Sequence, residues 1–278
     1  MNKKTLKGIG IALSVVLVAV ILFFVNAFSG NPVSKALATS TAKKHLAETY
    51  AGTDYYIDEV RYNFKDGDYH AFIKSPSSID TEFSLYITMT GKLRLDTFED
   101  VGSGFNTARR LNMEYSLLAD KIFYGEDFPY SCYISFATLE IYPDNYMNSD
   151  YNDAPAYAIN QSELELDKQY NIRELGRRAG KIVVYVENDT VTAEKAAEVM
   201  LGMKSIFDEA DLPFAAMDYV LQHPKPEEGV RSDEEVCAYN FLYDDIKEEN
   251  LVERVAEADR TAKEEYAKMD KEAEVEQE

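Results

Sequence analysis

Cysteine, histidine and tryptophan are scarce in this chain of 278 residues, which has two cysteines, three histidines and no tryptophan. No two cysteines have C-x-x-C spacing, which excludes a zinc ribbon and a thioredoxin-type redox site. Cys132 and Cys237 both lie in apolar, strand-like runs. We expect two buried free thiols, or a single disulfide if the two strands are neighbours in an exported domain.

Common signatures of catalysis are also missing. The chain has no G-x-S-x-G motif and no Gly-rich phosphate loop. His45, His70 and His223 have no second His or Cys at metal-ligand spacing, so exposed or edge histidines are the expectation. We therefore expect no metal, no cofactor and no enzymatic activity.

Basic residues are few beyond the N-terminus. Lys3, Lys4 and Lys7 are the only charged residues up to Val33, so residues 34–278 carry 26 basic and 50 acidic residues, a net charge of −24. Such a surface repels nucleic acid and anionic head groups, and we expect no nucleic-acid partner.

One long apolar run stands out against this polar background. Gly8 to Ser29 is free of charge, and as a helix of 22 residues it would extend ~33 Å, enough to cross a bilayer. The lysines before it predict a cytoplasmic N-terminus and exported domains. Residues 1–33 are thus expected to be a cytoplasmic stub and a single-pass anchor. The alternative is a signal peptide cleaved near Ala27, followed by secretion.

Residues 34–125 are predicted to form the first extracytoplasmic domain, of the α+β class. Residues 34–50 have helical periodicity, and Asp66-Gly67 is typical of a hairpin turn. Four segments alternate between apolar and polar residues: 58–64, 69–73, 83–89 and 93–95. A helix at 108–122 completes the prediction of helices packed on an antiparallel meander.

Residues 126–245 are predicted to form a second domain, an α/β sandwich. Strands are expected at 132–142, 181–187, 214–221 and 236–243, and helices after Asn171 and Thr192. The unbroken apolar run at 182–186 predicts a strand buried on both faces. Residues 246–278 are predicted to be a charged C-terminal helix and tail.

Four short motifs carry a resemblance to a known family. They are NAFSGNPVSK at 26–35, SPSS-x-DT with FSL at 75–85, NTARRL at 106–111 and FPY at 128–130. Together they resemble the YfjL-like proteins, which are membrane-anchored and have matching N-terminal and C-terminal domains. The resemblance implies no catalytic residues, because no biochemical activity is assigned to that family. The helix and meander of residues 34–98 also resemble PepSY and cystatin-like exported modules, some of which bind or restrain proteases.

Two acidic clusters can be explained without a functional site. Glu163, Glu165 and Asp167 alternate with leucines, which predicts a solvated face. The Asp- and Asn-rich stretch 144–153 lacks the residue order of a calcium loop.

Tyrosine is abundant, with 20 residues, and several fall outside the periodic core pattern. These predict a contact surface for another envelope protein or a peptide: Tyr55, Tyr56, Tyr146, Tyr151 and Tyr157. The leading hypothesis is therefore a membrane-anchored extracytoplasmic binding module. The alternatives are a PepSY-like restraint or folding aid for a secreted enzyme, and an exported hydrolase with an unrecognised site.

Overall fold

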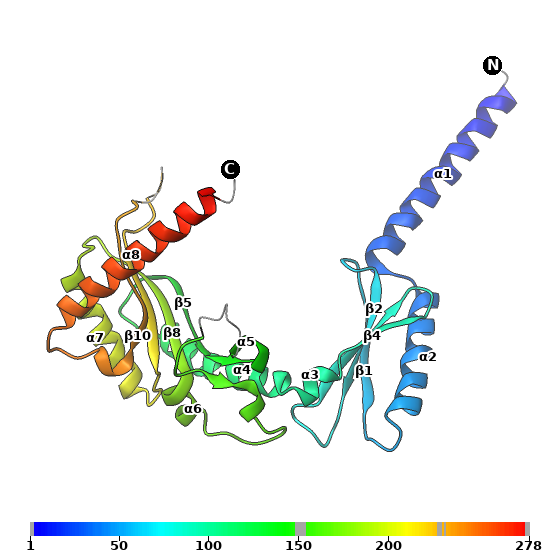
Figure 1. Cartoon of the computed structure of the whole chain (residues 1–278). Helices are drawn as coiled ribbons and strands as arrows, with labels where there is room; N and C mark the ends of the chain where they lie inside the picture. The colour runs from blue at the N-terminus through cyan, green and yellow to red at the C-terminus, as the bar shows by residue number, and fades with distance from the viewer. Residues whose placement is uncertain (1–2, 148–153, 227–229, 231, 276–278) are drawn as a thin grey trace. The chain divides into compact units, whose positions relative to one another are not determined.

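The computed structural model of the chain describes residues 3–147, 154–226, 230 and 232–275. It has two compact units, Met1–Asn106 and Thr107–Glu278 (Figure 1). The α+β class expected for the chain is confirmed, with an antiparallel sheet in the first unit and a second sheet in the other.

Helix α1 (Lys3–Ser29) contains the apolar run. In the part of the chain that the structure describes, it is the one stretch long and apolar enough to cross a membrane. Gly30, with a φ of 66°, separates it from α2 (Pro32–Thr49). Asn31 caps α2, accepting a hydrogen bond from the Ser34 N–H at 2.8 Å, and Pro32 occupies the first turn, where its missing N–H costs nothing.

The predicted meander is confirmed as a four-stranded antiparallel sheet in the order β1-β2-β3-β4. Its strands are β1 (Tyr56–Asn63), β2 (Asp68–Lys74), β3 (Glu82–Thr88) and β4 (Leu93–Asp96). Ala38 and Ala42 of α2 are fully buried against it, since small side chains let the helix approach the sheet closely. A short helix, α3 (Glu99–Gly102), follows.

The second unit is built on a mixed sheet in the order β10-β9-β8-β5. Its strands are β5 (Cys132–Leu139), β8 (Gly180–Glu187), β9 (Ala216–Gln222) and β10 (Glu235–Leu242). β8 and β9 are parallel, joined through α7 (Ala193–Glu209), and both edge strands are antiparallel to their neighbours. Two two-residue strands, β6 (Ile141–Tyr142) and β7 (Ile159–Asn160), pair separately, and the short helices are α5 (Asp144–Met147) and α6 (Ile172–Ala179).

The division between the units differs from the sequence-based boundary at residue 125. Helix α4 (Phe105–Phe123) was expected to close the first domain. Its buried side chains Leu111, Tyr115, Ala119 and Phe123 instead belong to the core of the second unit. Helical periodicity predicts which side of α4 is apolar, but not which core receives that side.

The charged C-terminal helix expected from residue 246 is observed as α8 (Leu251–Val275), and its Leu251 and Val255 are buried in the second core. One further expectation needs correction. β8 is not fully buried on both faces. The face toward α7 is buried, with Ile182, Val184 and Val186 on it. The opposite face, called the outer face below, carries Val183 and Tyr185, which are half-buried.

The disulfide alternative is also excluded. Cys132 is on β5 and Cys237 on β10, which are the two opposite edges of the sheet. With strands about 4.8 Å apart, these edges are separated by roughly 14 Å, too far for a disulfide. Both cysteines are free thiols.

Candidate functional site

Three charged side chains meet on the outer face of the second sheet, where β5 ends. Glu140 follows β5 directly, Lys181 is in β8 and Asp218 is in β9. The Lys181 Nζ lies 2.9 Å from Asp218 Oδ2 and 3.9 Å from Glu140 Oε1. Their side chains are only 14%, 19% and 6% exposed. A largely buried lysine thus lies between two largely buried carboxylates.

The strand registers explain why these residues meet. Lys181 pairs with Thr138 of β5, and Asp218 pairs with Val183, two residues along β8 from Lys181. Because side chains alternate between faces with a period of two, Glu140, Lys181 and Asp218 all point to the same face.

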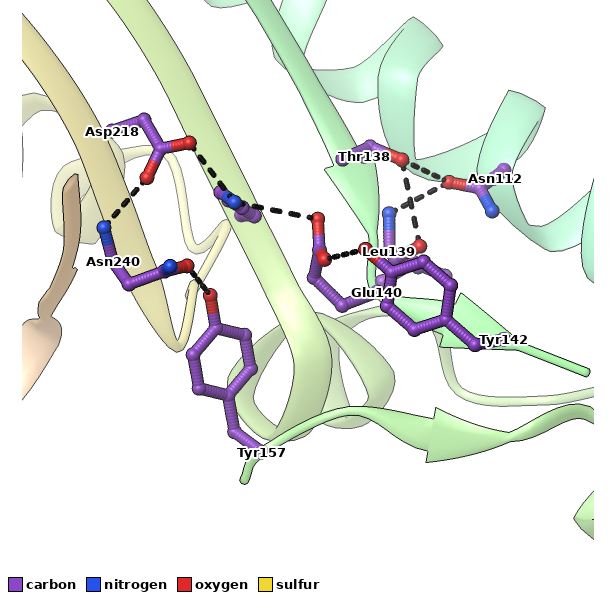
Figure 2. A network of polar contacts seen from close by, with 9 residues as sticks. Asn112, Thr138, Leu139, Glu140, Tyr142, Tyr157, Asp218 and Asn240 are labelled. Carbon is purple, nitrogen blue, oxygen red and sulfur yellow. Dashed lines mark hydrogen bonds and ion pairs between the residues drawn. The ribbon is translucent and has the colours of Figure 1, made fainter. Parts of the chain in front are cut away.

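Hydrogen bonds satisfy the remaining carboxylate oxygens. The Tyr142 hydroxyl donates to Glu140 Oε2, and the Asn240 N–H donates to Asp218 Oδ1 at 2.6 Å (Figure 2). Asn240 has a φ of 48° at an irregularity in β10, which turns its backbone toward β9. The Tyr157 hydroxyl donates to Asn240 Oδ1 at 2.9 Å. We call these six residues the Lys181 cluster: Glu140, Tyr142, Tyr157, Lys181, Asp218 and Asn240.

The cluster tyrosines are hydrogen-bond donors and not bases. Burial, followed by the hydrogen bond to Glu140 and its charge, raises the pKa of Tyr142 far above its ordinary value. Burial, followed by the charges of Glu140 and Asp218, does the same to the pKa of Tyr157. Both phenols therefore stay protonated at any physiological pH.

A second group of contacts ties α4 to the end of β5. Asn112 Oδ1 accepts from the Thr138 hydroxyl at 2.6 Å and from the Leu139 N–H at 2.7 Å (Figure 2). The Glu140 N–H donates to the Ala179 carbonyl of α6, and the Ile159 N–H donates to the Glu140 carbonyl, both at 2.8 Å. These bonds fix the backbone around Glu140 on three sides.

The contacts of the Lys181 cluster join several elements of the second unit, and they already engage its charged groups. Each carboxylate already has a cation and a neutral donor as partners, so neither is poised as a general base. Among the residues that the structure describes, no three His, Cys, Asp or Glu side chains are grouped as a metal site requires. Burial raises the pKa of Cys132 to about 11 and of Cys237 to about 12, so neither thiol is an activated nucleophile.

The five tyrosines predicted as a contact surface divide between the two units. In the first unit, Tyr56 is 44% exposed, whereas Tyr55 is half-buried and packs on the rings of Tyr50, Phe83 and Phe98. Both line a hollow of about 610 Å³ with Lys43 and Leu46.

In the second unit, Tyr146 is 40% exposed and stacks on Tyr142, with ring centroids 4.7 Å apart. Tyr157 is half-buried in the Lys181 cluster, and Tyr151 lies outside the described residues. A single contact patch formed by all five therefore stays a prediction.

The three histidines all have acidic partners. His45 is half-buried, with Nε2 2.7 Å from Asp96 Oδ2, an oxygen that also accepts from the Tyr50 hydroxyl at 2.7 Å. This contact joins the end of α2 to β4. His70 pairs with Asp66 at 2.7 Å and His223 with Glu234 at 3.1 Å.

The acidic residues weighed from the sequence form local surface contacts. Glu163 pairs with Arg178 at 2.8 Å and caps a short 3₁₀ turn, and Glu165 pairs with Lys168. Asp144 Oδ1 accepts from the Asn160 side chain at 2.8 Å, and residues 148–153 of that stretch lie outside the described residues.

Sequence reasoning missed the Lys181 cluster, although a signal was present. Glu140, Lys181 and Asp218 are each a single charge next to or within an apolar strand segment. A charged residue in such a place is expensive to bury unless it is paired. Three such residues in three strands of one sheet indicate that they meet.

The strand that leads into the cluster is also the most exposed part of this sheet. β5 is an edge strand, and among the described residues it pairs with β8 alone. Its Tyr133 is 61% exposed and its Phe136 is 42% exposed. On the outer face, Phe136 adjoins the half-buried side chains of Val183 and Tyr185.

Family models match both units. The model of the YfjL-like N-terminal domain matches residues 3–97, and that of the YfjL-like C-terminal domain matches residues 114–256. The chain belongs to the YfjL-like family. No curated protein matches the chain, and no solved structure does. The Lys181 cluster and β5 both lie in the region matched by the YfjL-like C-terminal domain.

Proposed function

We propose that this YfjL-like chain is a single-pass membrane protein whose two extracytoplasmic units bind an extended segment of another envelope protein. The observation that carries this proposal is β5, an edge strand with exposed aromatic side chains beside an apolar strip. Exposed strand edges are templates for pairing with a further strand, and flanking apolar side chains give such pairing selectivity.

The hydrogen-bonding groups of β5 point the right way for strand addition. The N–H of Glu140 is directed inward, to Ala179, and that of Leu139 outward, to Asn112 of α4. Alternation along the strand then directs the backbone of Ser135 and Ala137 away from β8, toward the open edge. A peptide lying along this edge would contact Tyr133 and Phe136 with its side chains.

The anchor is proposed to be retained, with the N-terminus in the cytoplasm. Lys3, Lys4 and Lys7 precede the apolar run, which supports that orientation. Asn26 and Ala27, the residues at the candidate cleavage point, hydrogen-bond with Asn31 and Tyr62 of the first unit. Protease added outside cells with a permeable wall should digest residues 34–278, and full protection of that region would contradict this topology.

Strand addition is tested by replacing Tyr133 with a photo-crosslinking amino acid in the full chain in its native membrane. Illumination should give discrete adducts with a second protein. Tyr124, 74% exposed at the end of α4, is the matched control position and should give none. Ser135→Pro removes an outward N–H, which an edge strand tolerates, and should abolish the adducts. Equal adducts at both positions, or adducts that survive Ser135→Pro, would reject pairing at β5.

A PepSY-like role is a second candidate, favoured by one feature of the first unit. There α2 packs on a four-stranded meander, and the hollow lined by Tyr55 and Tyr56 opens beside it. A restraint on a secreted protease would use this hollow and not β5. Crosslinks from Tyr56, with none from Tyr133, would favour that role.

The remaining candidate is an exported hydrolase, and the Lys181 cluster is where it would have to act. Lys181, Glu140 and Asp218 are mutually paired, which argues for a structural role. A Lys181→Arg variant that folds normally but loses every deletion-complementing activity would favour the enzyme.

A further inference from the structure

The end of the membrane helix is built into the first unit. The Tyr62 hydroxyl donates to the Ala27 carbonyl of α1 at 3.1 Å. The Tyr69 hydroxyl accepts from the Asn31 N–H at 2.7 Å and donates to the Asn31 carbonyl at 2.8 Å. Two sheet tyrosines thus hold the backbone on both sides of Gly30, so α1 and the sheet are joined at a fixed junction.

This junction places the β1–β2 hairpin beside the last turn of α1. The Phe28 ring of α1 and the Phe64 ring of the hairpin have centroids 6.0 Å apart. Both remain open to solvent, with Phe28 61% and Phe64 56% exposed. Val33, in the first turn of α2, is 70% exposed. We call Phe28, Val33 and Phe64 the juxtamembrane patch.

We propose that the juxtamembrane patch docks on the bilayer that holds α1, so that the first unit lies on the membrane in one orientation. This inference rests on the retained anchor of the proposed function. The occupant is lipid because the patch is continuous with the apolar surface of α1, in which Phe24 stacks on Phe28 with centroids 6.4 Å apart. A side chain level with the last turn of a spanning helix lies at the membrane interface, where aromatic residues are enriched.

Two exposed lysines lie beside the patch, Lys35 in α2 and Lys65 in the hairpin. The acidic residues next to them are paired with other side chains, Asp66 with His70 and Glu59 with Arg61. A lysine close to an anionic membrane surface is attracted to it. The rest of the extracytoplasmic chain is strongly acidic, so docking through any other face would be opposed.

The chain has no tryptophan, so a single introduced tryptophan reports on its own surroundings. Phe64→Trp in the full chain is reconstituted into vesicles of phosphatidylcholine and phosphatidylglycerol, with brominated lipid as the quencher. We expect a blue-shifted emission and a loss of intensity on bromination. Val33→Trp is a second probe of the patch and should behave in the same way.

Ile79→Trp is the matched control. Ile79 is 56% exposed, as Phe64 is, but lies in the β2–β3 connection at the opposite end of the sheet. Its emission should be unshifted and unquenched. If the chain floats with the vesicles but Phe64→Trp and Val33→Trp behave like Ile79→Trp, the docking proposal is rejected and the proposed anchor is kept. If the chain does not float with the vesicles, the anchor itself fails and the docking fails with it.

Discussion

The Tyr69 hydroxyl bonds to both the N–H and the carbonyl of Asn31, 38 residues earlier in the chain. Tyr69 is 2% exposed, so neither bond is replaced easily by water. This one hydroxyl links the cap of α2 to the start of β2, close to where α1 ends.

Tyr69→Phe should lower the free energy of unfolding of the first unit by about 1–3 kcal/mol, because the Asn31 N–H loses its partner and the Asn31 carbonyl keeps only its bond from the Lys35 N–H. Tyr86→Phe is the control, since Tyr86 is on the opposite face of the same sheet. The measurement is chemical denaturation of the full chain in detergent micelles. Equal effects of the two substitutions would mean that the Asn31 contact contributes nothing.

Gly30→Ala should destabilise the first unit more than Gly52→Ala. Both glycines have positive φ, 66° and 87°, a conformation that costs an alanine roughly 1–2 kcal/mol. Only at Gly30 would the new Cβ also clash, lying 2.8 Å from Tyr62 Cγ, whereas nothing lies within 4 Å of it at Gly52. Thermal melts that show the same shift for both variants would contradict the packing at this junction.

Lys181→Met should destabilise the second unit by about 3–5 kcal/mol at neutral pH, since two largely buried carboxylates lose their cation. Adding Glu140→Gln and Asp218→Asn should recover most of the loss, as measured by urea unfolding at neutral pH.

Both cysteines should be free and slow to react in the folded chain. Burial raises the pKa of Cys132 from 9.0 to about 11, so the folded state keeps a proton that the unfolded chain releases. This contribution to stability is complete below pH 9 and is lost as the pH rises toward 11. A thiol reagent at pH 8 should label the native chain slowly and find two thiols after unfolding without reductant. Finding fewer than two would indicate a disulfide that the sheet order forbids.

Residues 105–278 should fold without the first unit, whereas residues 126–278 should not. The difference is α4, whose Leu111, Tyr115 and Phe123 are buried in the second core, each worth roughly 1.5–3 kcal/mol of burial. Dispersed amide NMR spectra are expected for residues 105–278 and also for residues 34–106. A folded fragment of residues 126–278 would instead support the domain boundary at residue 125 that the sequence predicted.

Much of the first unit could be predicted because its signals are local. Alternation over 58–64 and 69–73, with Asp66-Gly67 between, predicts a hairpin without reference to the rest of the chain. The apolar run from Gly8 to Ser29 similarly predicts a long apolar helix from composition alone. Neighbouring strands in a meander also pair in chain order, so even the order of that sheet followed.

The second unit was less predictable because its strand order is not the chain order. Periodicity identified β5, β8, β9 and β10 as strands, but it could not show that β5 and β10 are opposite edges. That order decides that Cys132 and Cys237 stay free, that β5 presents an open edge, and that Lys181 lies between Glu140 and Asp218.

The sequence by itself determined the apolar helix, the helix-and-meander layout and the helix starts at Asn171 and Thr192, since each depends on residues a few positions apart. Only the tertiary structure decided that α4 joins the second core, that α8 packs on that core, and that the Tyr69 hydroxyl bonds to the backbone of Asn31, 38 residues away. Those outcomes depend on which apolar faces pack together. An amphipathic pattern predicts that a face will be buried, but it does not predict which element will cover that face.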